Sequence, residues 1–176
     1  MRGSIARDRK DAMNRAPIPW VILSMSVLAA DRLTKTLVER MTVSGWRRVV
    51  IPGFFDLVHT RNPGIAFGLL ADSQLPWMRM ALIGLSLIAA SAMAWLLLAG
   101  RAGGQRSRAG IALILGGAAG NLLDRLFDGG VVDFILLYYR RFEWPAFNVA
   151  DSAIVIGAAL VLLELLTARH PEPEQA

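Results

Sequence analysis

The chain has 176 residues, 55% of them hydrophobic, with a formal net charge of +5 and a mean hydropathy of +0.45. It has no cysteine, which excludes disulfides, thiolate nucleophiles and cysteine-ligated metals, and its two histidines, His59 and His170, give little basis for a histidine metal site or triad. The positive charge does not indicate a nucleic-acid partner, because arginines flanking long apolar runs are the usual pattern of a membrane protein.

Four apolar segments approach the length of about 20 residues that a membrane-spanning helix needs. We expect spans at about 18–38, 75–100, 109–125 and 147–168. The first follows a basic lead, so it also fits a cleavable secretory signal. However, helical character continues through "DRLTKTLV", where Asp31 and Lys35 stand four residues apart, share a face and can neutralise each other. We therefore interpret this segment as a retained span with a polar last turn.

The segments between the spans carry signals of their own. Within 43–60, β-branched and aromatic residues with a Pro-Gly breaker predict short strands at the membrane surface. Residues 61–72 turn at "NPG" and continue as a short amphipathic helix that could act as a lid. Within 124–147, "LLYYRRFEWP" is typical of the headgroup zone. The sequence thus predicts an all-α membrane protein with four transmembrane helices, forming one integral-membrane domain at 1–168 with a disordered tail at 169–176.

The distribution of charge sets the expected orientation. The basic lead before the first span favours a cytoplasmic N-terminus, and four spans then return the C-terminus to the cytoplasm. With this orientation, acids from three helices and one loop come to the same depth near the outer face, namely Asp31, Asp124, Asp133 and Asp151.

Asp133 and Asp151 are the leading candidates for chemistry. In a soluble protein Asp151 would be interpreted as a helix cap together with Asn148, and Asp133 as a cap or turn residue. In a membrane segment, ionisable groups are costly and usually mark a working site. If the two carboxyl groups face each other, they hold one proton, so one can act as base on water and the other as acid toward a carbonyl or leaving amine. Peptide hydrolysis needs one acid and one base, and such a carboxyl pair supplies both without a cysteine, histidine or metal.

The other polar residues at this depth have structural interpretations. Asp124 with Arg125, and Asp31 with Lys35, are expected to form networks that orient the aspartate pair. Three amides could be turn or cap residues or could bind substrate backbone, namely Asn62, Asn121 and Asn148. The run "GGAAG", 116–120, predicts close helix packing, and Glu164 is expected at the interface near the inner end.

Three other classes of function use the same residues. A transporter or channel subunit could relay protons or cations through Asp133 and Asp151, although such proteins usually contain internal repeats and none is visible in this sequence. A metal-dependent hydrolase could use the aspartates as ligands. A Ser–Lys protease could use Ser152 or Ser24 with Lys35, but Ser152 points about 100° away from Asp151 around the helix and Lys35 already has an acid partner.

The motifs together resemble one known family. "GGAAGNLLDRLFDGGVVDFI" and "FNVADSAIVIG" are similar to the two C-terminal motifs of the bacterial lipoprotein signal peptidase, signal peptidase II. "DRLTK" resembles its Asp-x-x-Thr-Lys element, with Arg32 where glutamine is expected, and "RNPGIAF" resembles its Asn-x-Gly-x-x-Phe element. The resemblance covers 18–167 with the motifs in the family's order.

This resemblance implies an intramembrane aspartyl protease of the bacterial inner membrane, with four helices, both termini cytoplasmic, a β-rich extracytoplasmic cradle and an active site near the outer leaflet. Its substrate would be a diacylglyceryl-modified prolipoprotein, cleaved on the amino side of the lipid-bearing cysteine, and globomycin would bind in the substrate position. It also implies a monomer in membrane lipid, without metal or cofactor. The implied catalytic residues are Asp133 and Asp151, and the implied supporting residues are Asp31, Lys35, Asn62, Gly64, Asn121, Asp124, Arg125 and Asn148.

Overall fold

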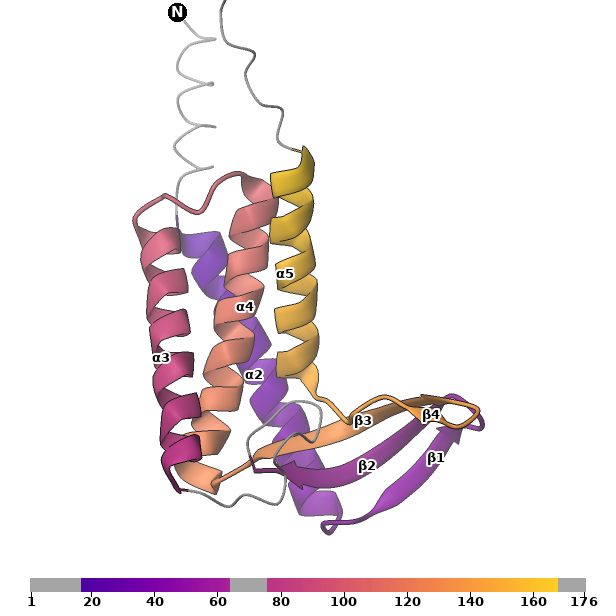
Figure 1. Cartoon of the computed structure of the whole chain (residues 1–176). Coiled ribbons are helices and arrows are strands. Elements are labelled where there is room, and N and C mark those ends of the chain that lie inside the picture. The colour runs from indigo at the N-terminus through magenta and orange to yellow at the C-terminus, as the bar shows by residue number, and fades with distance from the viewer. Residues whose placement is uncertain (1–16, 64–75, 168–176) are drawn as a thin grey trace, which may run out of the picture.

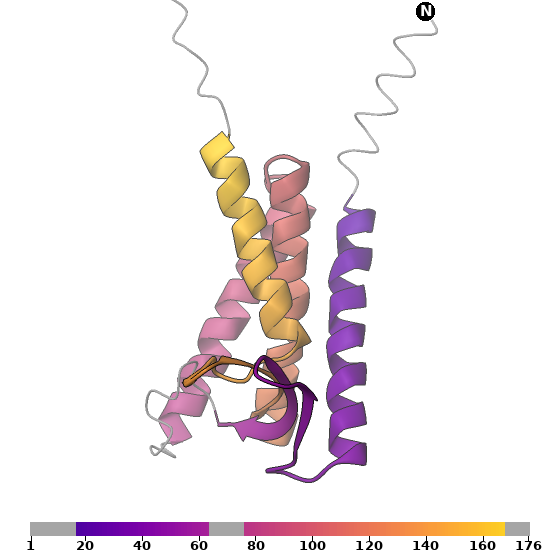
Figure 2. The ribbon, with the colours of Figure 1, turned by 90° about the vertical axis from the view of Figure 1, so that its right-hand side faces the viewer.

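The computed structural model of the chain describes residues 17–63 and 76–167. Within them, four long helices run alongside one another as a bundle (Figure 1, Figure 2), namely α2 (Ile18–Met41), α3 (Pro76–Leu98), α4 (Gln105–Leu123) and α5 (Val149–Thr167). A four-stranded sheet projects sideways from one end of this bundle. The start of α2 and the end of α5 lie at the opposite end (Figure 1).

Helices occupy all four segments in which the sequence predicts spans, but their compositions differ. Three stretches of the described residues are long and apolar enough to cross a membrane, namely Met80–Leu98, Gln105–Asp128 and Val149–Thr167. Leucines on α3 and α5, such as Leu85 and Leu165, are exposed in the bundle, as expected for side chains that face lipid. Helix α2 is as long, but it carries Asp31 and Lys35 in its second half, and its composition alone does not identify it as a span.

The sheet confirms the expected strands and adds two that the sequence did not predict. Strands β1 (Arg47–Ile51) and β2 (Phe55–Asn62) form an antiparallel hairpin, as predicted for 43–60. Strand β3 (Val131–Tyr139) pairs with β2 and with the short β4 (Phe142–Glu143), giving the order β1-β2-β3-β4. Asp133 lies on β3 opposite Thr60, so its interpretation as a cap or turn residue is wrong.

Some predicted features lie outside the described residues. They are the basic lead, the short amphipathic helix after Pro63 with Gly64, and the tail at 169–176.

Helix α4 is the centre of the bundle, and its small residues allow close approach on two sides. Gly110 faces Gly157 of α5 so closely that a Cβ on either residue would lie within 2.5 Å of the other's carbonyl oxygen. Gly120 faces α2, where a Cβ would lie 2.4 Å from a carboxylate oxygen of Asp31. The prediction of close helix packing at "GGAAG" is therefore confirmed, and this packing brings the polar turns of α2, α4 and α5 together.

Glu164 has a more specific role than the expected interfacial position. Its carboxylate accepts hydrogen bonds from the backbone N–H groups of Gly104, at 2.6 Å, and Ser107, at 2.9 Å. These donors belong to the first turn of α4, whose N–H groups have no partner within the helix. Glu164 thus caps α4 and ties it to the last turns of α5, at the end of the bundle away from the sheet.

Adding a methyl group at the α4–α5 contact should destabilise the bundle. We expect Gly110→Ala to lower the free energy of unfolding by about 1–3 kcal/mol, because its Cβ would overlap the Gly157 carbonyl. The matched control is Gly84→Ala on α3, where nothing lies within 4 Å of an added Cβ and no loss is expected. The measurement is thermal unfolding of the purified protein in detergent, and equal melting temperatures for the two variants would contradict the packing described.

Candidate active site

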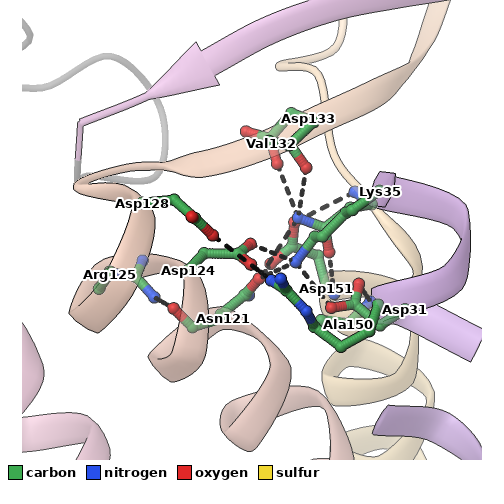
Figure 3. Close-up of polar contacts among 12 residues, drawn as sticks. Asp31, Lys35, Asn121, Asp124, Arg125, Asp128, Val132, Asp133, Ala150 and Asp151 are labelled. Atoms are coloured by element: carbon green, nitrogen blue, oxygen red, sulfur yellow. Dashed lines mark hydrogen bonds and ion pairs between the residues drawn. The ribbon is translucent and has the colours of Figure 1, made fainter. Parts of the chain in front are cut away.

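The site is organised around the ammonium group of Lys35, which is 1% exposed (Figure 3). Lys35 Nζ lies 2.7 Å from Asp31 Oδ2, 2.6 Å from Asp124 Oδ2 and 3.0 Å from Asn121 Oδ1. An ammonium has three N–H donors, and three oxygens surround this one. The expected pairing of Asp31 with Lys35 is confirmed. The cluster joins α2 to Asn121 in the last turn of α4 and to Asp124 at the start of η2, the π-helical turn Asp124–Asp128.

Asp31 has a second partner, on α5. Its Oδ1 accepts a hydrogen bond of 2.9 Å from the backbone N–H of Ala150, in the first turn of α5. Carboxylates are favoured at helix N-termini because the first N–H groups lack partners within the helix. Asp31 is fully buried, so this bond and the one from Lys35 satisfy both carboxylate oxygens away from water. Helix α2 therefore fixes the position at which α5 begins.

Asp151 is held at the start of α5 by a reciprocal cap. The Asn148 side-chain oxygen accepts a 2.9 Å hydrogen bond from the Asp151 backbone N–H, and Asp151 Oδ2 accepts one of 3.2 Å from the Asn148 backbone N–H. This is the geometry of a capping box, with the acid three residues after the cap. The other oxygen, Oδ1, accepts a 2.7 Å hydrogen bond from the Asn121 amide on α4. The expected capping role of Asn148 and Asp151 is thus confirmed, and Asp151 has an additional contact.

Asp133 comes from the sheet rather than from the bundle. Its Oδ1 accepts a 2.7 Å hydrogen bond from the Asn148 side chain, and its Oδ2 accepts one of 3.3 Å from the Asn62 side chain at the end of β2. The side chain is 3% exposed. Burial, together with the nearby negative charge of Asp151, raises the pKa of Asp133 to about 7.

The two aspartates are therefore close and electrostatically coupled, but each is oriented by amides. Their four carboxylate oxygens accept from the side chains of Asn62, Asn121 and Asn148 and from one backbone N–H. Among the described residues no hydrogen bond joins the two carboxyl groups directly, and Asn148 links them by donating to both. Such a pair, with one protonated and one ionised member, can activate water and protonate a leaving group.

Asp124 and Arg125 both belong to this network, but they do not have the partners expected from their adjacency. Asp124 forms ion pairs with Lys35 and with Arg32, and Arg32 Nη1 also lies 3.6 Å from Asp128 Oδ2 (Figure 3). Arg125 donates to the backbone oxygen of Asn121 at 3.1 Å. Consecutive helical residues point about 100° apart, which explains why these neighbours diverge. Sequence reasoning missed Arg32, although its position three residues before Lys35 places both on one face of α2.

The candidate serine nucleophiles have other hydrogen bonds. The Ser152 hydroxyl donates to the Asn148 backbone oxygen at 2.9 Å, and the Ser24 hydroxyl donates to the Ala112 backbone oxygen at 2.9 Å. Lys35, the proposed base of a Ser–Lys pair, contacts neither serine and is surrounded by the oxygens described above. Across residues 17–63 and 76–167, no three acidic or histidine side chains are grouped as metal ligands.

Comparisons with known proteins decide the family. The family model described as signal peptidase (SPase) II matches residues 23–167. The chain belongs to the signal peptidase II family. It is 48% identical over 147 residues to a lipoprotein signal peptidase of Solibacter usitatus, covering 80% of this chain and 85% of that protein. It is 41% identical over 162 residues to a lipoprotein signal peptidase of Cupriavidus necator, covering 92% and 90%.

A solved structure supports the same conclusion about the fold. The chain superimposes with a TM-score of 0.75 on a bacterial membrane enzyme, with 28% sequence identity, 90% of this chain covered and 94% of the other. As a member of the signal peptidase II family, the protein is a peptidase with a mostly helical, membrane-spanning structure and a small antiparallel sheet.

The protonation state of Asp133 can be measured directly. Infrared difference spectra of the purified protein should contain a protonated-carboxyl band that disappears as the pH rises through about 7, and Asp133→Asn should abolish it. Asp151→Asn should move the midpoint of this titration to lower pH, because it removes a neighbouring negative charge. A band that titrates below pH 5 in the wild-type protein would contradict the described environment of Asp133.

Folding stability should follow the same titration. The pKa of Asp133 is higher in the folded protein than its ordinary value of 3.8, so the folded state binds more protons between these values. Its contribution to stability is therefore fully present below about pH 4 and is lost as the pH rises through about 7.

Proposed function

We propose that Asp133 and Asp151 are the catalytic pair of an endopeptidase that removes signal peptides from prolipoproteins. The observation that carries the proposal is the arrangement of the two carboxyl groups, which are electrostatically coupled and have all four oxygens oriented by amide donors. The curated relatives are named lipoprotein signal peptidases, which supports a prolipoprotein as the substrate. The bond cleaved is the one on the amino side of the diacylglyceryl-modified cysteine.

The protons are assigned by the environments of the two acids. Asp133, whose pKa is raised to about 7 by burial and by Asp151, carries the shared proton and acts as the general acid. Asp151 takes a proton from the attacking water while Asp133 gives its proton to the carbonyl oxygen, so that hydroxide adds to the scissile carbonyl carbon and a neutral gem-diol intermediate forms. When this intermediate collapses, the C–N bond breaks, the proton held by Asp151 passes to the leaving nitrogen, and Asp133 recovers its proton from a gem-diol hydroxyl. No covalent enzyme intermediate is needed, and no metal or cofactor takes part.

The remaining polar residues bind the substrate or position the two aspartates. Asn121 and Asn148 hold the aspartates, and Asp31, Lys35 and Asp124 hold Asn121 and the start of α5. Asn62 orients Asp133, and Gly64, also proposed as a supporting residue, lies outside the described residues. Arg125, on η2 directly after α4, is proposed to contact the substrate backbone. A cyclic peptide inhibitor of the globomycin type would occupy the same place.

We further propose that α2 is a fourth transmembrane helix, so that residues 1–168 form one integral-membrane domain. Its buried charges do not prevent insertion, because Asp31 and Lys35 neutralise each other inside the bundle and do not face lipid. With α2 as a span, both termini lie in the cytoplasm and the site lies near the outer leaflet of the inner membrane. The protein acts as a monomer there, so that substrate lipid chains can reach the site between helices.

The sheet supports this placement. Its far end, where the two hairpin tips lie side by side, exposes large apolar and basic side chains, namely Ile51, Phe54, Tyr139, Arg140, Arg141, Phe142 and Trp144. Aromatic and basic side chains together are typical of the headgroup zone. The sheet would therefore rest on the outer leaflet as an extracytoplasmic cradle, level with the acids that it helps to position.

The catalytic assignment is tested by removing either carboxyl group. Asp133→Asn and Asp151→Asn should each lower kcat about 10²–10⁴-fold, because each removes one partner of the acid–base pair, while the protein still accumulates in the membrane. Ser152→Ala, one residue from Asp151, is the matched control and should retain cleavage. Near wild-type activity in either aspartate variant would remove that residue from the mechanism, and loss of activity in the control alone would favour a serine nucleophile.

The substrate class is tested with a pair of matched prolipoproteins. Purified enzyme should cleave a diacylglyceryl-modified prolipoprotein and leave the unmodified form intact, and a chelator should not change the rate. Cleavage of both forms at equal rates would contradict the proposed specificity, and inhibition by the chelator would indicate a metal-dependent hydrolase.

A further inference from the structure

Arg32 is connected to the catalytic pair through the buried cluster, although it contacts neither aspartate of the pair. Its guanidinium pairs with Asp124 Oδ1, and the other oxygen of Asp124 lies 2.6 Å from Lys35 Nζ. Lys35 donates to Asn121 Oδ1 at 3.0 Å, and the amide nitrogen of Asn121 donates to Asp151 Oδ1 at 2.7 Å. A continuous chain of polar contacts thus runs from Arg32 on α2 to the carboxylate of Asp151 on α5; Figure 3 shows its part from Lys35 to Asp151.

Arg32 supplies a second positive charge to the cluster of Asp31, Lys35 and Asp124. Asp31 and Asp124 are at most 1% exposed and carry two negative charges, whereas Lys35 supplies one positive charge. A buried charge without a partner is costly, so the cluster needs a second cation. Arg32 fills this place and is partly open to solvent, with its side chain 36% exposed. The same nitrogen, Nη1, also lies 3.6 Å from Asp128 Oδ2, at the other end of η2.

We propose that Arg32 is a positioning residue for the cleavage reaction. Arg32 neutralises part of the negative charge of Asp124. The Lys35 ammonium is therefore not drawn fully onto Asp124 and keeps its contacts with Asp31 and Asn121. The contact from Lys35 to Asn121 Oδ1 fixes which way the Asn121 amide is turned, and therefore keeps its N–H on Asp151. Arg32 thus acts on the orientation of the base and not on substrate binding.

Removal of Arg32 should therefore change turnover more than apparent substrate affinity. This inference rests on the proposed function, so the experiment uses the full-length purified protein and a diacylglyceryl-modified prolipoprotein. We expect Arg32→Gln to lower kcat about tenfold and to leave KM within about twofold of the wild-type value. Arg32→Lys, which keeps the positive charge, should recover most of the lost kcat. Arg40→Gln, which removes an exposed cation from the same helix, is the matched control and should behave as wild type.

The route through Asp124 is tested in a second background. In Asp124→Asn, adding Arg32→Gln should change kcat by less than about twofold, because the charge that Arg32 neutralises is already gone. This pair also keeps the test informative if Arg32→Gln alone does not fold, since the double variant buries no uncompensated charge at this place. Asp128→Asn should leave kcat close to wild type, because Asp128 has no contact with Lys35.

Three results would overturn the inference. They are wild-type kcat in Arg32→Gln, a change confined to KM, or failure of Arg32→Lys to recover more activity than the glutamine variant. If wild-type enzyme itself does not cleave the lipid-modified substrate, the proposed function fails instead, and the two failures are distinguished by that single measurement.

Discussion

The site depends on the burial of one ammonium group, that of Lys35. Lys35 is buried in a mostly apolar bundle, so its three N–H donors must find partners within the protein. The ammonium donates to Asp31 on α2 and to Asn121 on α4, and it forms an ion pair with Asp124 on η2. Because the cost of an unpaired charge there is large, these elements cannot move apart without losing stability. The contacts of this cluster therefore fix the positions of Asn121 and of the start of α5, and through them the position of Asp151.

The helix packing makes this arrangement geometrically accessible. Gly120 leaves room for the carboxylate of Asp31 against α4, and the Gly110–Gly157 contact brings α5 against the other side of the same helix. The sheet then supplies the second aspartate from outside the bundle, and Asn148 joins the two parts through its bonds to Asp133 and Asp151. The proposed catalytic pair thus lies where the bundle meets the sheet, with one acid from each.

Local rules predicted the parts of this site that depend on nearby residues. Spacing of four along a helix predicted the Asp31–Lys35 pair, and the β-branched run at 43–60 predicted the first hairpin. The same rules failed for contacts between distant residues. Nothing in the local sequence connects Arg32 to Asp124, 92 residues later. Adjacency instead suggested Arg125 as the partner of Asp124, which was wrong. Asp133 was expected in a loop, because the strand that carries it pairs with β2, which is distant in sequence. The family resemblance implied both aspartates and the three asparagines as supporting residues, but not which asparagine contacts which aspartate.

We infer that the Lys35 ammonium orders the two proposed catalytic aspartates, and replacing Lys35 is the sharpest test. Lys35→Met keeps a long apolar side chain in place but removes all three donors. The measurement is kcat of the purified variant on a diacylglyceryl-modified prolipoprotein, with the amount of folded enzyme determined in parallel. We expect kcat per folded molecule to fall by about 100-fold, because Asn121 Oδ1 loses its hydrogen bond from Lys35 and retains the longer one, 3.3 Å, from Asn148, so that the amide that contacts Asp151 is held less firmly. Cleavage at the wild-type rate would contradict it.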